Sequence, residues 1–356
     1  LLQVTMGVMA GGWGARVPEI RAAVGADDRT WGLVSAAPAV GDVLALSIVF
    51  FLIGRVNTRR LALVGAVLIL INAPLAAAAP SLTLLVAGYA AWIFGASMMA
   101  TPMGGLQLEV QRQYGRSLMG SFIACWSLGS FAGAGLGTLA AAVSVAPGLQ
   151  FAICSVILGA LLLFCGRWLP DETIPARTAG ARPRILDRFT GPLLLLALMS
   201  FLAGIINNGP STWSASYTKS LGAGAATAAA TYTAAAITSA VGQLVVDRPL
   251  SRFGPVPVLL VSMAVGVSGM VLALAVGTPA ASIVGFALVG LGMSCTGPII
   301  NGRADRQSQV SASEAVSMVE MGYLPGNYLS PVIIGLLAGV TGLREALVVV
   351  IVALVA

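Results

Sequence analysis

The sequence contains no histidine and few charged residues of any kind. Without histidine there can be no histidine acid–base catalysis, metal ligation or proton relay, so any proton chemistry must use carboxylates. Only 9% of the 356 residues are charged, whereas 58% are apolar, and the mean hydropathy is +0.94. This leaves too little polar surface to coat a soluble globule of this size. The composition therefore places the chain in a lipid bilayer.

Features that signal enzymes and metalloproteins are also missing. The four cysteines have neither CxxC spacing nor the pattern of a secreted domain, and we expect reduced packing residues at Cys125, Cys154, Cys165 and Cys295. There is no metal-ligand cluster, glycine-rich phosphate loop or GxSxG motif. We expect no cofactor, no metal and no enzymatic activity. The arginines lie in short clusters between apolar runs, which is typical of membrane loops and argues against nucleic-acid binding.

Apolar windows recur along the chain at about the 20 residues needed to cross the hydrocarbon. They fall at 1–22, 31–53, 61–79, 82–106, 117–142, 148–168, 190–216, 223–246, 256–276, 280–302, 313–339 and 343–356. We therefore predict an all-α integral membrane protein with twelve transmembrane helices. The last window ends with the sequence, so the last helix looks truncated.

A polar segment interrupted by prolines, Arg167 to Arg188, divides these windows into two sets of six. We predict an N-terminal six-helix bundle at 1–168, a linker at 169–188 and a C-terminal six-helix bundle at 189–356. Most of the 19 basic residues lie in this linker and in alternate connections on the same side. The positive-inside rule makes that side cytoplasmic, together with both termini.

The two halves resemble each other at a shift of 196–197 residues. Gly95-Ala-Ser97 matches Gly292-Met-Ser294, Pro102 matches Pro298, and Arg55 matches Arg252. A steady shift through helix, loop and helix indicates duplication. Internal repeats of this kind are typical of secondary transporters, whose solute site lies where the repeats meet.

Asp42 is the most unusual charged residue in the apolar windows. It lies about eleven residues from either end of the second window, or ~16 Å deep at ~1.5 Å per residue. A carboxylate at that depth is costly unless it is paired, protonated or hydrated. We interpret Asp42 as a proton-coupling or cation-binding site; the alternative is a buried acid held by Arg16 or by a backbone group.

Glu320 is a second candidate for proton coupling, ~10 Å from the nearer face of the eleventh window. Glu320, Tyr323 and Asn327 follow at helical spacing, which places an acid, a hydroxyl and an amide on one helix face. They are candidates for the wall of a solute path. An interhelical hydrogen-bonding face without a ligand is the alternative.

The first and seventh windows supply the other candidate solute contacts. Arg16, three residues after Trp13, could hold an anionic group, pair with Asp42 or reach the outer interface. The seventh window carries Asn207, Asn208 and Trp213 around Gly209-Pro210, which predicts an interrupted helix with free carbonyls. Its Tyr217 is better explained as an interfacial aromatic residue.

The arrangement of windows and loops resembles the major facilitator superfamily (MFS) over the whole chain. That family has the loop motif G-x-x-x-D-R-x-G-R-R, and here the corresponding loop carries Arg55, Asn57, Arg59 and Arg60, with Gly54 at the aspartate position. A degenerate second copy contains Ser251 and Arg252. We expect Asn57 to replace glycine by adopting the left-handed backbone. The stretch from Trp13 to Pro18 also resembles a Trp-Ala-Ala-Arg-Ile-Pro signature of an uncharacterised bacterial branch.

The resemblance implies a cytoplasmic gate in which loop residues form ion pairs. The candidates are the basic and acidic residues near these motifs: Arg55, Arg59, Arg60, Glu109, Arg112, Arg252 and Asp305. Glycines at 129, 133 and 137 have the spacing of the family's antiporter motif, but the proline that follows the second glycine is Ala134 here. Close helix packing explains them equally well.

These observations predict a secondary active transporter that moves a small organic solute by alternating access, coupled to protons through Asp42 and Glu320. Aromatic and amide side chains favour uptake of a sugar-like or other neutral polar solute. The alternatives are drug or metabolite efflux by proton antiport and a transporter-like receptor that no longer cycles. We expect a monomer in the bacterial plasma membrane, with the solute, protons and lipid as its partners.

Overall fold

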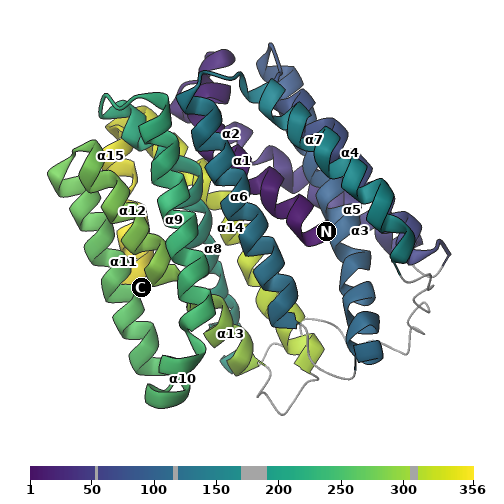
Figure 1. The fold of residues 1–356 in the computed structure, drawn as a ribbon. Helices are drawn as coiled ribbons and strands as arrows, with labels where there is room; N and C mark the ends of the chain where they lie inside the picture. The colour runs from purple at the N-terminus through teal and green to yellow at the C-terminus, as the bar shows by residue number, and fades with distance from the viewer. Residues whose placement is uncertain (53–54, 115–118, 170–190, 305–311) are drawn as a thin grey trace. The chain divides into compact units, whose positions relative to one another are not determined.

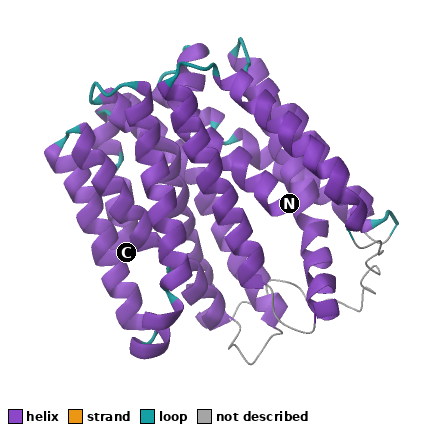
Figure 2. Cartoon of the chain, viewed as in Figure 1, coloured by secondary structure: helices purple, strands orange, loops and turns teal. Residues whose placement is uncertain are grey.

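The computed structural model describes residues 1–52, 55–114, 119–169, 191–304 and 312–356. Within these ranges the regular elements are helices, and Figure 2 draws no strand among them. Long runs of leucine, alanine and valine explain this, because a backbone in hydrocarbon must satisfy its hydrogen bonds within its own segment. The predicted all-α membrane fold is confirmed.

Eight helical segments of the described part are long and apolar enough to cross a membrane. Two of them, Pro147–Trp168 and Pro255–Val276, correspond to the most aliphatic windows and bury only 22% and 28% of their most apolar stretch. Such segments expose apolar side chains that require lipid around them. The count of twelve spans remains a prediction.

The chain divides into two compact units. The first unit comprises Leu1–Ala26 and Ala36–Arg177, and the second Asp27–Ser35 and Thr178–Ala356. The helices of the first unit are α1 (Leu2–Ala23), α3 (Ala37–Leu52), α4 (Thr58–Ala77), α5 (Leu82–Tyr114), α6 (Met119–Ala142) and α7 (Pro147–Cys165), followed by the 3₁₀ turn η1 (Gly166–Trp168). In Figure 1 these helices run from purple to teal.

The second unit contains the following helices: α2 (Asp28–Val34), α8 (Gly191–Ser220), α9 (Ala225–Val245), α10 (Asp247–Phe253), α11 (Pro255–Val276), α12 (Pro279–Met293), α13 (Thr296–Ala304), α14 (Ala312–Thr341), α15 (Leu343–Ala346) and α16 (Val348–Val355). Proline at the first turn starts α11 and α12, where a missing N–H costs nothing. Figure 1 shows α11 and α12 side by side in green, consistent with their extensive contact.

The second predicted window is not one continuous helix. It breaks at Ser35–Ala36 into α2 and α3, and α2 packs on α14 within the second unit. The two helices approach closely at Gly32, where a Cβ would collide with the backbone of Pro331 and Gly335. A short helix from the first half of the sequence thus packs with the second unit.

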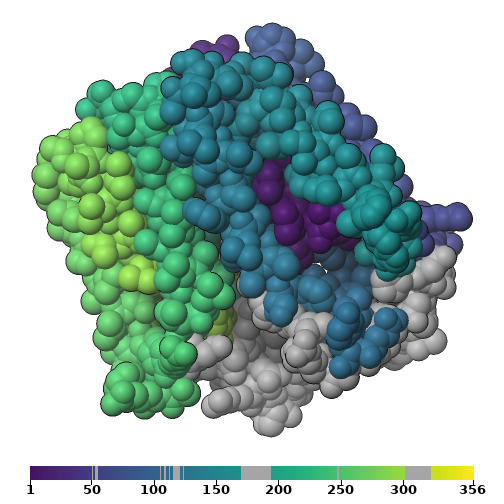
Figure 3. Space-filling model, viewed as in Figure 1, coloured from purple at the N-terminus to yellow at the C-terminus, as the bar shows by residue number. Residues whose placement is uncertain are grey.

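Glycine determines the closest helix pair of the first unit, α1 on α6. A Cβ on Gly7 or Gly11 would collide with the backbone of α6 around Ser130, and one on Gly129 or Gly133 would collide with the backbone of α1. Small residues let membrane helices approach this closely. Figure 3 shows the purple surface of α1 between the teal surfaces of α6 and α7.

The second unit repeats this packing at a shift of 197 residues. Gly204 of α8 meets the backbone of α14 as Gly7 meets that of α6, and Gly326 of α14 meets Phe201 as Gly129 meets Val4. The duplication seen in the sequence thus extends to matched interhelical contacts. The glycine spacing in α6 is accounted for by helix packing.

Candidate functional site

Asp42 lies on α3 and is half-buried against α5. The two helices approach closely because Gly41 faces the backbone of Ala90 and Phe94. The hydroxyl of Ser97 on α5 donates a hydrogen bond to Asp42 Oδ1. No arginine or lysine of the described ranges lies within ion-pair distance of Asp42. The site is therefore a carboxyl group held by a neutral donor, whose charge is not balanced by a fixed cation.

Arg16 is buried, and its ion-pair and hydrogen-bond partners do not include Asp42. Its side chain is 1% exposed, and its Nε forms an ion pair with Glu19 one turn later on α1. The guanidinium also donates to the carbonyl of Gly137 on α6, at 3.3 Å, and to that of Val145 in the following connection. Pairing with Asp42 is wrong for Arg16, because its ion-pair partner is Glu19. Its contacts tie the guanidinium to the interior of the first unit.

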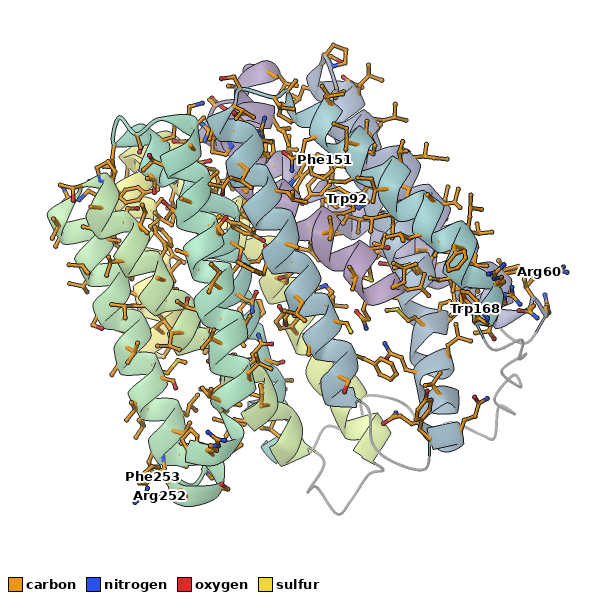
Figure 4. The ribbon with its side chains drawn as sticks, in the orientation of Figure 1. Arg60, Trp92, Phe151, Trp168, Arg252 and Phe253 are labelled. Carbon is orange, nitrogen blue, oxygen red and sulfur yellow. The ribbon has the colours of Figure 1, made fainter. Side chains whose placement is uncertain are left out.

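Trp13 belongs to an aromatic cluster inside the first unit. Its ring stacks on Tyr89 with centroids 4.6 Å apart and lies 4.9 Å from Trp92, both on α5. Phe151 of α7 completes the cluster, and Figure 4 shows Phe151 and Trp92 close together. Sequence reasoning identified only Trp13, because aromatic residues on three different helices have no common spacing.

Asn208 and Asn327 are brought together by the contact of α8 and α14. Asn208 Nδ2 donates to the carbonyl oxygen of Asn327 at 2.7 Å, and Asn208 Oδ1 accepts from Thr212 Oγ1 at 3.2 Å. Asn207, one residue earlier, has an exposed side chain. Two windows 119 residues apart thus contribute polar groups to one patch of the second unit.

The predicted interruption at Gly209-Pro210 is wrong, because α8 continues unbroken from Gly191 to Ser220. Proline removes one donor from the ladder, but hydroxyl groups bind carbonyls around it. Ser211 Oγ donates to Asn207 O at 2.7 Å, and Ser330 Oγ of α14 donates to Ile205 O at 2.9 Å. These bonds stabilise the carbonyls on either side of that of Ile206, which Pro210 leaves without its helical N–H.

The aromatic residues at the end of α8 are buried. Trp213 is 0% exposed, and Tyr217 is 1% exposed with its hydroxyl donating to Ala273 O at 3.2 Å. Tyr217 therefore does not expose its ring to lipid, as an aromatic residue of an interfacial belt would. Its ring packs 6.2 Å from that of Phe286 on α12, so it joins three helices of the second unit.

A chain of buried hydroxyl groups lies beside Tyr217 and was not foreseen. Thr231 of α9 donates to Thr218 of α8 at 2.9 Å, and Thr218 lies 2.7 Å from the Ser282 hydroxyl of α12. All three are fully buried. Three neutral side chains thus satisfy one another where three helices meet.

The remaining candidates on α14 are only partly described. Tyr323 is half-buried, and its carbonyl lies against Gly204 of α8. Glu320 lies in α14, but its side chain is outside the described residues. Its role in proton coupling therefore stays a prediction.

Asn57 in the loop motif does not adopt a left-handed conformation. Its φ is −56°, and its side-chain oxygen accepts the backbone N–H groups of Arg59 and Arg60, so it is the N-cap of α4. The left-handed backbone occurs at the matched position of the second copy, Gly254, with φ 81°. Asn57 therefore serves as a helix cap in the first copy, whereas Gly254 provides a positive φ in the second.

The structure describes the side chains of four of the seven predicted gate residues. Arg55 and Arg60 are exposed and Arg59 is half-buried, near the start of α4, while Arg252 is exposed on α10. The side chains of Glu109 and Arg112 on α5, and the whole of Asp305, lie outside the described residues. The predicted ion pairs of the gate stay a prediction.

A cavity of about 450 Å³ opens near the ends of α8 and α11 in the second unit. Arg344 borders it and donates from Nε to the carbonyl of Leu274 at 2.8 Å. The lining residues are Asp28, Tyr217, Ser220, Leu221, Ala275, Val276, Gly277, Leu343, Arg344 and Glu345. No sequence pattern predicts this cavity, because its walls come from separate parts of the chain.

Comparison with known proteins agrees with this architecture. A family model described as Major Facilitator Superfamily matches residues 2–313. Similar proteins include an uncharacterised transporter of Sinorhizobium fredii, 27% identical over 95% of this chain and 89% of that protein, and an uncharacterised MFS-type transporter of Yersinia pestis, 28% identical over 94% and 86%.

Solved structures of two transporters share the fold. A crystal structure of a mutant of the nucleoside transporter NupG has a TM-score of 0.79 at 14% identity, covering 99% of this chain and 96% of that one. A bacterial homologue of the human lysosomal transporter Spinster, inward-facing and unoccupied, has a TM-score of 0.72 at 14% identity, covering 100% and 93%. At such identities the likeness concerns the fold alone.

Proposed function

The chain belongs to the Major Facilitator Superfamily of membrane transporters, and we propose that it carries a small neutral polar solute by alternating access, driven by protons that bind Asp42. The proposal includes two six-helix bundles at 1–168 and 189–356, a cytoplasmic linker at 169–188 and cytoplasmic termini. It also takes the monomer as the working unit.

The observation that carries the proposal is the environment of Asp42. A carboxylate in the middle of an apolar helix is costly when no cation balances it. Ser97 supplies one hydroxyl donor, which stabilises the charged form without neutralising it. Such a group can take up a proton when the surroundings become dry and release it when water enters. A permanent ion pair, like that of Arg16 and Glu19, could not do this as readily.

The solute contacts are proposed on α8 and α14. Asn207 and Asn208 of α8, with Tyr323 and Asn327 of α14, offer amide and hydroxyl groups that bind hydroxylated solutes without demanding a charge. Trp213 supports α8 from within its unit, because its ring is buried. Sugars, polyols and nucleosides fit this chemistry. Nucleosides also merit inclusion because NupG, which shares the fold, is described as a nucleoside transporter.

A thermal-shift screen of the purified protein in detergent tests the solute class. The panel contains sugars, polyols, nucleosides, amino acids and lipophilic cations. A ligand at about 100 times its dissociation constant adds roughly 2.7 kcal/mol to stability. We expect a sugar, polyol or nucleoside to stabilise the wild type and to do so less in Asn207→Ala, whose exposed amide is removed. Stabilisation by lipophilic cations alone would instead favour proton-driven efflux.

A further inference from the structure

One end of the first unit carries four arginines around the start of α4 and the end of α7: Arg55, Arg59, Arg60 and Arg167. In the described part of the chain no carboxylate lies within ion-pair distance of any of them. Arg55, Arg60 and Arg167 are exposed. The patch therefore holds several positive charges that the described protein does not neutralise.

Two of these arginines stand where their charge is unfavourable. Asn57 caps α4, so Arg59 and Arg60 fall in its first turn, which contains no acidic residue. The N-terminus of a helix carries a partial positive charge that favours anions and disfavours cations. An anion bound near the two arginines would offset this repulsion. The arrangement thus favours a negative ligand from outside the described chain.

Aromatic side chains surround the fourth arginine. The Arg167 guanidinium lies 4.6 Å from the ring centre of Phe164 and 4.3 Å from that of Trp168. Both rings are largely exposed, at 58% and 62%. Tryptophan beside arginine is typical of the level where lipid head groups meet hydrocarbon. The surroundings of Arg167 thus have the composition of that level.

The two parts of the patch lie side by side. Gly166, directly before Arg167, packs on Leu63, which follows Arg59 and Arg60 by one turn of α4. Figure 4 shows Arg60 and Trp168 at the same end of the unit. Along α7 the exposed side chains next to this end are apolar, with Leu163 86% exposed. A cationic head-group level thus adjoins a surface suited to acyl chains.

The second repeat lacks this patch. At the shift of 197 residues, Arg59 and Arg60 correspond to Val256 and Pro257 at the start of α11. Arg252 corresponds to Arg55, and its guanidinium lies 5.2 Å from the centre of the Phe253 ring. Figure 4 labels both residues. Duplication alone therefore does not account for the arginines of α4, and the second repeat provides a matched control.

We propose that the start of α4 and the end of α7 form a binding site for the phosphate group of an anionic phospholipid. Arg59, Arg60 and Arg167 donate to the phosphate, and the acyl chains lie along α7. Basic clusters at the ends of membrane helices bind anionic head groups in this way, and guanidinium groups suit phosphate because they donate in pairs. The site is independent of the transported solute.

The test measures retention of phosphatidylglycerol by purified protein in a neutral detergent, using native mass spectrometry, with phosphatidylcholine as the zwitterionic comparison. The variants are Arg59→Gln/Arg60→Gln and, as matched control, Arg248→Gln/Arg252→Gln, which removes the same charge from the second repeat. Each arginine near a head group contributes about a fivefold gain in affinity. We expect the first variant, which lacks two arginines, to bind phosphatidylglycerol about 25-fold more weakly, and the control to change by less than about twofold.

Equal weakening by both doubles would overturn the proposal, because binding would then follow net charge alone. Equal retention of phosphatidylcholine and phosphatidylglycerol by the wild-type protein would also overturn it, because the site would then not select an anionic lipid. Arg59→Lys/Arg60→Lys keeps the charge but not the paired donors, so it should bind phosphatidylglycerol more weakly than wild type and more strongly than the glutamine double. Binding by the lysine double as weak as that of the glutamine double would contradict the site. Inorganic phosphate at millimolar concentration should not displace the lipid, because displacement would indicate a free-anion site instead.

Discussion

The two units share a packing scheme but enclose different chemistry. In the first, α1 packs on α6 through glycines and the Arg16–Glu19 ion pair lies beside this contact, while Asp42 lies on α3, which packs on α5. In the second, α8 packs on α14 through matched glycines. At the positions that correspond to Arg16 and Asp42 it carries Trp213 and Ser239, both neutral. The repeats share backbone contacts, whereas these charged groups occur in one of them.

This difference suggests a division of labour. Among the described side chains, the charged groups of the first unit suit proton binding and a fixed internal ion pair, whereas the amides and hydroxyls of α8 and α14 suit a neutral solute. Gly11 and Asn208 illustrate it, because they occupy matched positions. Gly11 meets the carbonyl of Ser130 with no room for a side chain, while the Asn208 amide donates to the matching carbonyl of Asn327.

Breaking the internal ion pair should have the largest effect on stability. Arg16→Met removes the cation that pairs with Glu19 and one donor each from the carbonyls of Gly137 and Val145. Removing one partner of a buried pair costs about 3–5 kcal/mol. We expect a loss of this size in unfolding by denaturing detergent. Adding Glu19→Gln should recover part of it, and a single variant within about 1 kcal/mol of wild type would refute the structural role of the pair.

The glycine contacts give the next largest effect. Gly133→Ala places a methyl group against the backbone of Val8, which cannot move aside as a side chain would. Overpacking of this kind costs about 1–3 kcal/mol, and we expect the upper end. Gly135→Ala on the same helix meets nothing within 4 Å and should be neutral or stabilising. Thermal melts of the two variants that coincide would contradict the account.

Removing the amide of the second unit should have the smallest effect on stability. Asn208→Ala loses two hydrogen bonds, one to Asn327 O and one from Thr212, together worth about 1–2 kcal/mol. Gly11→Ala at the matched position of the first unit should cost clearly more, because its methyl group meets backbone. The comparison fails if the order of the two melting temperatures is reversed. Asn208→Ala should also weaken solute binding, which Gly135→Ala should not.

Much of the fold could be predicted from the sequence because long apolar runs mark membrane helices. The repeat was also visible, since matched residues such as Ser97 and Ser294 kept one shift across helix and loop. The break between α2 and α3 was missed, although Pro38 in the first turn of α3 is a signal that a helix begins there. The break comes with the packing of α2 on α14.

The site was less predictable because the hydrogen-bond and ion-pair partners of a side chain depend on which helices pack together. Asp42 was identified by its depth, but Ser97, its partner, lies 55 residues away and resembles any other small residue of a membrane helix. Arg16 was expected to reach outward or to Asp42, yet Glu19 was one turn away. Tyr217 was interpreted as an interfacial aromatic residue from its place in the seventh window. The sequence alone could not show that its hydroxyl donates to Ala273 O on another helix.

Proton-driven accumulation in proteoliposomes, with Asp42→Asn beside wild type and Ser97→Ala, tests the central claim most directly. The solute is taken from the panel of sugars, polyols and nucleosides, and an inward proton gradient is imposed. The account predicts that wild type accumulates the solute above equilibrium, that Ser97→Ala does so with altered pH dependence, and that Asp42→Asn only equilibrates it while still binding it. Accumulation by Asp42→Asn equal to that of wild type would contradict the assignment of proton coupling to Asp42.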